Sequence, residues 1–101
     1  GTKRGRGESS TAFHFAWLHH QRQPHHWQAW LSIGDGGKLL ALPIPQRFIL
    51  EMVADWYGAG KAITGRNDIA KWYEANGAKM ILDAATRVEV EATIERIKDT
   101  K

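Results

Sequence analysis

Residues Leu42–Ile63 read LPIPQRFILEMVADWYGAGKAI, and apolar residues recur along this stretch at helical spacing. Pro45 suits the first turn of a helix, where a missing backbone N–H costs nothing. The stretch therefore predicts a central amphipathic helix over about residues 45–59, in which Gly58 and Gly60 mark either its end or a close contact with another helix. We expect its apolar face to be buried against the first and last helices of the domain; the residues of that face include Met52, Val53 and Trp56.

Shorter helical segments lie on both sides of this central stretch. TAFHFAWLHHQR, residues 11–22, follows capping residues and ends before Pro24. GDGG at Gly34–Gly37 is a turn signal between two apolar stretches, which favours a short β-hairpin. Two further helices are expected, one between Asn67 or Asp68 and Gly77, and a last one capped by Asp83, with Val88, Ala92 and residues 94–97 as its apolar stripe. The sequence thus predicts an all-α domain, a small bundle of four to five helices with one hairpin around Gly34–Gly37.

Length and composition limit the class of protein. The chain has 101 residues, a formal net charge of +3 and no cysteine, which excludes disulfides, cysteine-ligated zinc and a thiol nucleophile. Residues 1–9 are rich in glycine and basic residues, so we expect a flexible arm there and a single helical domain over residues 10–101. The arm offers a weak electrostatic contact for nucleic acid. No apolar run is long enough for a membrane span, and no membrane partner is expected.

Four of the five histidines lie in one stretch, HHQRQPHHW, which runs from His19 to Trp27. Neighbouring residues on a helix point about 100° apart, so one member of each pair should face inward and the other outward. Pro24 lies between the pairs and can fold the second pair back beside the first. Two inward imidazoles are about what a mononuclear metal site takes from such a motif.

Two carboxylates on the central helix are candidate partners for these imidazoles. Glu51 and Asp55 are four residues apart and share one helix face, beside the apolar stripe. Like charges held near a core are costly unless a metal, a histidinium or an arginine neutralises them. A set of imidazoles and carboxylates suits Zn, Mn or Fe, or Mg with mostly oxygen ligands. The alternative is a His–carboxylate hydrogen-bond network that stabilises the fold and binds no metal.

Two other motifs carry weaker functional readings. GAGK, residues 58–61, lacks the spacing and the following Ser or Thr of a phosphate-binding loop. The five tryptophans are expected in the core, and the alternative is that one or two line a cleft and stack on a base or sugar ring; they are Trp17, Trp27, Trp30, Trp56 and Trp72.

Several longer motifs resemble an uncharacterised family of tailed phages and bacteria, known only as a domain of unknown function. They are AWLHHQRQPHHWQAW, LPIP, EMVADWYGAGKAITG, WYEANGAKMIL and TRVEVEATI, and the resemblance spans about residues 12–97. Family members usually carry Asn where this chain has Gln23. Longer members have an upstream helical half with a His-Asp pair, so the resemblance implies that this chain is the C-terminal part of a longer architecture.

That upstream pair, with the later histidines and aspartate, is distantly similar to the HD-type metal-dependent phosphohydrolases. The similarity implies that His20, one or both of His25 and His26, and Asp55 are metal ligands. A bound metal would then activate water against a phosphoester or nucleotide substrate, with Glu51 or a histidine as the proton acceptor.

Two functions from different classes follow. The first is a metal-binding helical domain of phosphohydrolase type. The alternative is a non-catalytic phage-encoded binding or structural module, whose partner is a phage or host protein or a second copy. The expected location is the cytoplasm of a bacterial host, with association with the virion as the alternative.

Overall fold

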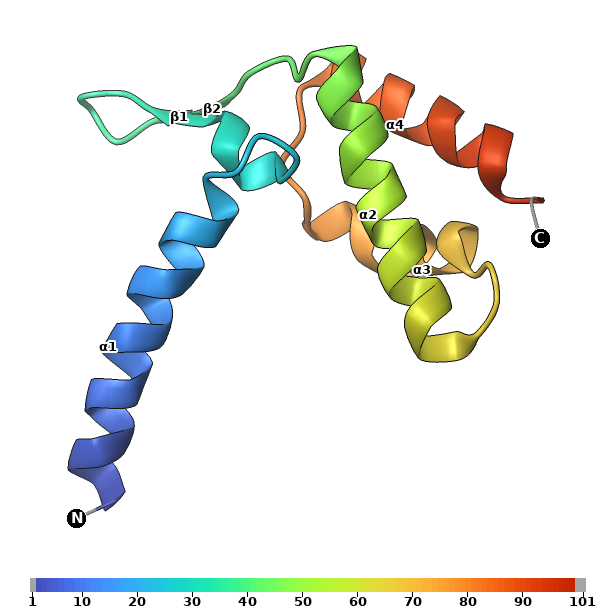
Figure 1. Cartoon of the computed structure of the whole chain (residues 1–101). Coiled ribbons are helices and arrows are strands. Elements are labelled where there is room, and N and C mark those ends of the chain that lie inside the picture. Colours follow the sequence, from blue (N-terminus) through green and yellow to red (C-terminus); the bar gives the residue numbers. More distant parts are fainter. Residues whose placement is uncertain (1, 100–101) are drawn as a thin grey trace.

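The computed structural model describes the backbone of residues 2–99 and the side chains of residues 10–99. Within this part, four α-helices and two 3-10 helices accompany a single two-stranded antiparallel hairpin (Figure 1). The predicted helical fold with one hairpin is confirmed at this level. The elements in chain order are α1 (Thr2–Gln21), η1 (Trp27–Trp30), β1 (Leu31–Ile33), β2 (Leu39–Ala41), α2 (Gln46–Thr64), α3 (Ile69–Asn76), η2 (Gly77–Lys79) and α4 (Ala84–Ile97).

The central helix α2 organises the domain, as its periodicity predicts. Pro45 occupies its N-cap, and the helix runs on to Thr64, about one turn beyond the predicted end. Gly65 ends it with a φ of 78°, in the left-handed region that favours glycine. Neither Gly58 nor Gly60 interrupts the helix. Glycine within a helix lowers its stability but does not break it when neighbouring turns are held by packing.

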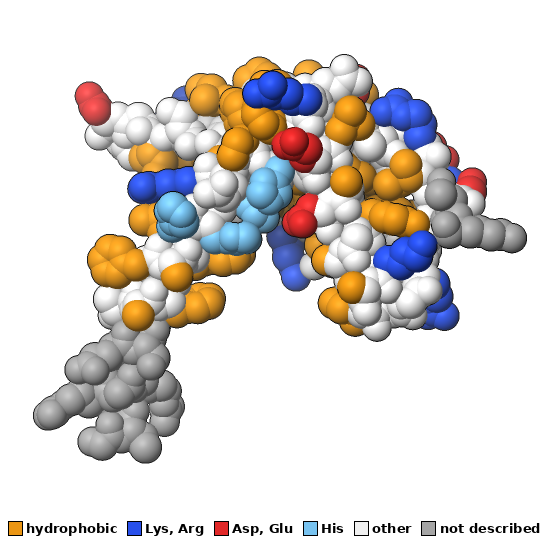
Figure 2. All heavy atoms as spheres, in the orientation of Figure 1, with side chains coloured by type: hydrophobic (Ala, Val, Ile, Leu, Met, Phe, Trp, Pro, Cys, Tyr) orange, Lys and Arg blue, Asp and Glu red, His pale blue; other side chains and the backbone are white. Residues whose placement is uncertain are grey.

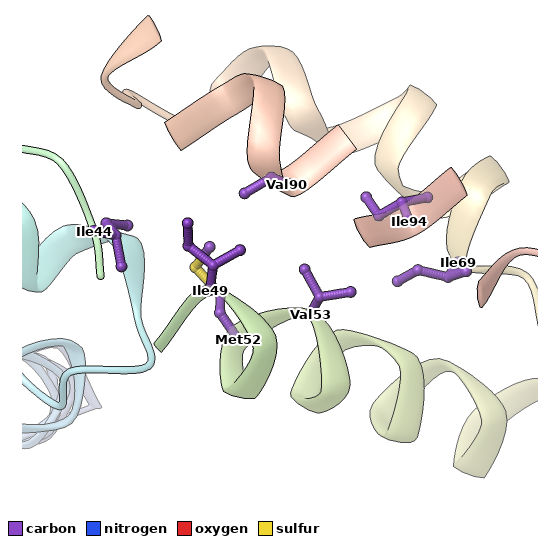
Figure 3. Packing of buried hydrophobic residues seen from close by; sticks show 7 residues of the cluster. All are labelled: Ile44, Ile49, Met52, Val53, Ile69, Val90 and Ile94. Atoms are coloured by element: carbon purple, nitrogen blue, oxygen red, sulfur yellow. The ribbon is translucent and has the colours of Figure 1, made fainter. Parts of the chain in front are cut away.

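The hydrophobic core lies where α2 meets α3 and α4 (Figure 3). One face of α2 supplies three of its residues, and α3, α4 and the segment before α2 supply the others. The buried cluster consists of Ile44, Ile49, Met52, Val53, Ile69, Val90 and Ile94. Burial of this apolar surface is the main force that holds α2, α3 and α4 together.

Three expectations about packing are wrong. Helix α1 does not cover α2 but projects away from the body, with its principal contact to η1 (Figure 1). Its apolar residue Phe15 is 72% exposed, and Trp17 is 42% exposed. Trp56 is half-buried rather than part of the buried cluster, and Val88 is 66% exposed. Ile94 of the predicted α4 stripe is buried, and the other buried apolar residue of this helix is Val90, four residues earlier on the same face.

Helix α1 starts at Thr2, well before the predicted start at residue 11. Its backbone therefore runs through the segment predicted as a flexible arm. The side chains of residues 1–9 and all of residues 1, 100 and 101 lie outside the described part. The flexibility of the arm and its contact with nucleic acid stay predictions.

Two polar contacts fix the junction between the central helix and α4. Asp83 caps α4 as predicted, and its carboxylate accepts hydrogen bonds from the amides of Ala85 and Thr86. The buried hydroxyl of Thr86 accepts a hydrogen bond of 3.0 Å from the amide of Ile44. A side chain of α4 thereby satisfies the backbone just before α2 begins.

Replacing Thr86 with Val is expected to lower the free energy of unfolding by about 1–3 kcal/mol, because the Ile44 amide would stay buried without an acceptor. Valine keeps the shape, so little packing is lost. Urea denaturation measures the change. A loss below about 0.5 kcal/mol would show that this hydrogen bond is replaced by water.

Arg87 ties η2 to α4. Its guanidinium donates to the carbonyls of Gly77 (3.2 Å) and Met80 (2.8 Å) and to the hydroxyl of Tyr73 (2.8 Å). The Tyr73 hydroxyl donates in turn to Glu91. These bonds hold the short 3-10 helix η2 in place, although it contributes only Gly77 and the adjoining Met80 to the buried residues.

No described helix is long and apolar enough to cross a membrane.

Candidate metal centre

His25, His26 and Asp55 come together at one side of the molecule. The two histidines lie in the connection between α1 and η1, and Asp55 lies on α2. One ligand atom from each residue can be chosen so that the three lie within 4.8 Å of one another. We call these residues the His-His-Asp triad. In Figure 2 the histidine side chains form a pale-blue group beside acidic side chains, in the concave region between α1 and the body.

The chain reversal at Pro24 builds this arrangement. The amide of His26 donates to the carbonyl of Gln23 over 2.9 Å, which closes a tight turn around the proline. The indole nitrogen of Trp30 donates to the Pro24 carbonyl over 2.9 Å and ties the turn to η1. The second histidine pair is thereby folded back beside the first, as the sequence predicts.

His20 is the member of the first pair that meets the second. The centroid of its ring lies 4.3 Å from that of His26, and the rings of His25 and His26 are 4.2 Å apart. Trp17, one turn earlier on α1, stacks on His20 at 5.6 Å. His20 is therefore a neighbour of the triad, although the close set of ligand atoms does not include it. Both imidazoles of the second pair, His25 and His26, belong to the triad. Helix geometry predicted that only one member of each pair faces inward.

The carboxylates are placed differently from the expectation. Glu51 and Asp55 share one face of α2, but both are exposed. Their charges are solvated, so the argument that a cation must offset their burial does not hold. Glu51 lies one turn before Asp55 and outside the triad.

The unusual group of the site is the imidazole of His26. Its ring nitrogen Nε2 is buried and has no hydrogen-bond partner within residues 10–99. The direct His–carboxylate network of the alternative hypothesis is not seen there either: no hydrogen bond joins an imidazole to Asp55 or Glu51 in this part of the chain. A buried ring nitrogen without a partner is costly, and a metal ion would satisfy it by binding its lone pair.

The surroundings of His26 lower the pKa of its imidazole. Burial is the largest cause, followed by the nearby imidazoles of His25 and His20, while the carboxylate of Asp55 acts in the opposite direction. The folded protein therefore favours neutral His26, which is the form that ligates a metal.

Stability is expected to fall on acidification because of this lowered pKa. The unfolded chain, in which the pKa is about 6.5, binds the proton more readily than the folded chain. Well above pH 6.5 His26 is neutral in both states and has no effect; as the pH falls through about 6.5, the folded state loses stability relative to the unfolded state. Urea midpoints of the metal-free protein between pH 7.5 and 5 measure the slope. His26→Gln should flatten it, whereas His14→Gln, on the exposed part of α1, should not. Equal slopes for wild type and His26→Gln would contradict this account.

A cavity of about 310 Å³ opens beside the triad. His26 and Asp55 form part of its wall, and the rest comes from α1, η1, α2, α3, η2 and Met80, which follows η2. The remaining lining residues are Trp17, Trp27, Gln28, Trp56, Trp72, Asn76, Lys79 and Met80. We call this space the tryptophan cavity. Trp17 and Trp72, expected in the core, are partly exposed here.

Sequence reasoning missed the polar wall of this cavity. Gln28, Asn76 and Lys79 come from three separate elements, and no spacing in the chain connects them to the histidines. The one signal in the sequence was the number of tryptophans, because one of the two hypotheses for them was that one or two line a cleft.

Comparison with known proteins gives a family but no function. A family of unknown function, DUF5662, matches residues 2–96. No curated protein and no solved structure matches the chain. The resemblance to a domain of unknown function is confirmed, while a phage origin and a likeness to HD-type phosphohydrolases stay predictions. Because the match covers nearly the whole chain, the protein belongs to DUF5662, a family of unknown function.

Proposed function

We propose that the protein binds a divalent metal ion through His25, His26 and Asp55 and uses it to hydrolyse a phosphoester. One observation carries the metal site. His26, whose Nε2 is buried and unpartnered, lies beside two other groups that metals favour, an imidazole and a carboxylate. A histidine buried for purely structural reasons normally has a hydrogen-bond partner.

The geometry of the triad supports this assignment. Ligand bonds of about 2.0–2.2 Å at tetrahedral angles place the ligand atoms roughly 3.3–3.6 Å apart. The triad atoms lie within 4.8 Å of one another, so metal binding needs only a small approach, and the exposed side chain of Asp55 is free to change rotamer. Two imidazoles and one carboxylate suit Zn, Mn or Fe better than Mg, which prefers oxygen ligands.

Three protein ligands leave coordination positions for water and substrate, which is the arrangement of catalytic rather than structural zinc sites. The metal would polarise the phosphoryl oxygens and lower the pKa of bound water. Oxygen from water then bonds to phosphorus, the bond from phosphorus to the ester oxygen breaks, and the alcohol leaves with a proton. Glu51, an exposed carboxylate one turn from Asp55, would accept this proton from water and pass it to the leaving alcohol oxygen. His20, whose ring packs on His26, would orient that ligand.

Release of inorganic phosphate from p-nitrophenyl phosphate tests this function. The full chain, without a histidine tag, would be loaded in turn with Zn, Mn, Fe or Mg. We expect turnover with at least one metal, lost on chelation and reduced at least roughly 100-fold by Asp55→Asn. Asp35→Asn, in the exposed turn of the hairpin, is the matched control and should leave the rate unchanged. Absence of turnover with every metal, or activity that survives both chelation and Asp55→Asn, would overturn the proposal.

A second candidate is the interaction module, and exposed apolar residues on α1 favour it. Phe13 is 60% exposed and Phe15 is 72% exposed, on a helix that projects from the body. Solvated aromatic side chains in such a position are typical of a surface that another protein covers. Light scattering of the full chain tests self-association. A dimer that Phe15→Asp dissociates would support this candidate, and a monomer at all concentrations would contradict self-association.

A further inference from the structure

We propose that the tryptophan cavity binds the organic part of the substrate, and that this part is a planar aromatic ring attached to the phosphate. This inference rests on the proposed function, because the phosphate is assigned to the triad. It adds the substrate class: phosphate esters that carry an aromatic ring, of which nucleotides and simple aryl phosphates are the two sources.

Aromatic walls are the first argument. Four of the five tryptophans line this one cavity, although they come from four different elements: Trp17, Trp27, Trp56 and Trp72. Trp17 and Trp72 are 42% and 36% exposed, so part of each indole remains accessible. Trp56 and Trp72 lie against each other, with ring centroids 5.1 Å apart. Indole faces accept stacked planar rings, and the volume of about 310 Å³ suits a small ligand.

Polar groups in the same wall are the second argument. Lys79 supplies a positive charge, and Gln28 and Asn76 supply amides that can bond the edge of a heterocycle. Asn76 donates to the Trp72 carbonyl over 2.9 Å, which fixes its side chain in the wall. Lys79 lies in η2, whose position Arg87 sets through the carbonyls on either side, those of Gly77 and Met80.

Continuity with the triad is the third argument. His26 and Asp55 belong to the lining of this cavity, so a ring among the tryptophans and a phosphate at the triad can be parts of one molecule. Lys79 then adds to the positive charge that holds the phosphate.

A neighbouring groove provides an internal comparison. It has a volume of about 240 Å³ and shares Asp55, Trp56 and Trp72 with the tryptophan cavity. Its lining includes Asp68 and apolar residues but no Lys, Arg or His among the described residues. Asp68 is paired with Arg66 over 3.1 Å, and no cationic side chain of the described residues lines the groove itself. The tryptophan cavity has Lys79 in its wall and is therefore the better site for an anionic ester.

The test uses phosphonates, because their carbon–phosphorus bond resists hydrolysis and allows equilibrium binding to be measured. The probes are phenylphosphonate, 5′-deoxyadenosine 5′-methylphosphonate and propylphosphonate, titrated into the zinc-loaded full chain by calorimetry. We expect the two aromatic probes to bind at least about tenfold more tightly than propylphosphonate, as stacking on an indole implies. A preference between the two aromatic probes distinguishes a nucleotide substrate from a simple aryl phosphate.

Variants connect this preference to the cavity. Trp17→Ala, at an exposed position of α1, should remove most of the advantage of the aromatic probes and leave propylphosphonate unaffected. Lys79→Ala should lower the affinity for all three probes. The matched controls are Phe15→Ala on the same helix and Lys71→Ala on α3, which lie outside this cavity and should change nothing.

The outcomes separate this inference from the proposed function. Zinc binding with equal affinity for all three probes, or an aromatic preference unaffected by Trp17→Ala, would overturn the inference and leave the metal site standing. Failure to bind zinc while the aromatic probes still bind would overturn the proposed function, and with it the assignment of the phosphate to the triad.

Discussion

Replacing His26 with alanine is expected to weaken binding of divalent metal by at least roughly 100-fold, because it removes the ligand most completely withdrawn from water. Loss of a residue that merely supports a ligand costs about 10- to 100-fold in affinity, so loss of the ligand itself should reach or exceed that range. His26 is the member of the triad whose nitrogen is buried and without a hydrogen-bond partner in the described part of the chain. Competition with a chromophoric chelator for Zn measures the affinity.

Two further variants make this result interpretable. Asp55→Asn keeps the size of an exposed side chain and removes its charge, so it should lower the affinity for the metal without unfolding the protein. His14→Ala removes an exposed imidazole outside the triad and should leave the affinity unchanged. If His14→Ala and His26→Ala have equal effects, the histidines bind metal as separate surface groups and the triad is not a site.

Metal binding should also stabilise the fold. A metal at 1,000 times its dissociation constant adds about 4 kcal/mol to the free energy of unfolding, and a chelator removes this gain. The shift in melting temperature on chelation should be absent in Asp55→Asn. A shift of the same size in that variant would mean that the chelator acts elsewhere on the protein.

Met52→Ala is expected to cause the largest loss of stability, about 2–5 kcal/mol. Met52 is 1% exposed and belongs to the buried cluster, beside Ile49 on α2 (Figure 3). Truncation removes buried apolar surface and leaves a cavity that the neighbouring helices cannot fully close. Methionine and alanine have similar helix propensities, so the change reports mainly on packing.

Leu50→Ala is the matched control for this prediction. Leu50 lies on the same helix and is 44% exposed, so its truncation should change the free energy of unfolding by less than about 1 kcal/mol. Denaturation by urea compares the two variants. Similar losses at both positions would show that α2 presents a different face to α3 and α4.

The sequence predicts those parts of the fold that depend on local chemistry. Helical spacing identified α2 and placed Met52 and Val53 inside, and the cap at Asp83 has the predicted hydrogen bonds. The apolar stripe of α4 was predicted correctly at Ile94 but wrongly at Val88, because Val88, Val90, Ala92 and Ile94 alternate with glutamate and threonine and permit more than one helix face. Only packing against α2 selects Val90 and Ile94.

The docking of α1 could not be predicted from its residues. Phe13 and Trp17 are four residues apart and share one helix face, with ring centroids 6.4 Å apart, whereas Phe15 lies on the opposite face, so the aromatic residues do not mark a single face. Such a pattern does not define which side is covered. In the structure these three side chains are largely exposed.

The candidate site was predictable in part. Pro24 between two histidine pairs indicated that the pairs meet, and a spacing of four placed Glu51 and Asp55 on one face. In the structure Asp55, and not Glu51, lies close to the imidazoles. This choice depends on how the turn around Pro24 packs against α2, which is a tertiary contact that the sequence does not reveal. The wall with Gln28, Asn76 and Lys79 is assembled from separate elements and leaves no pattern along the chain.

An anomalous difference map tests the central claim most directly. Crystals of the full chain, without a histidine tag, would be grown with one equivalent of Zn, and data collected on both sides of the zinc absorption edge. The account predicts a single strong peak at about 2.0–2.2 Å from one nitrogen of His25, the Nε2 of His26 and one carboxylate oxygen of Asp55. A peak ligated by other residues, or no peak at the triad, would contradict it.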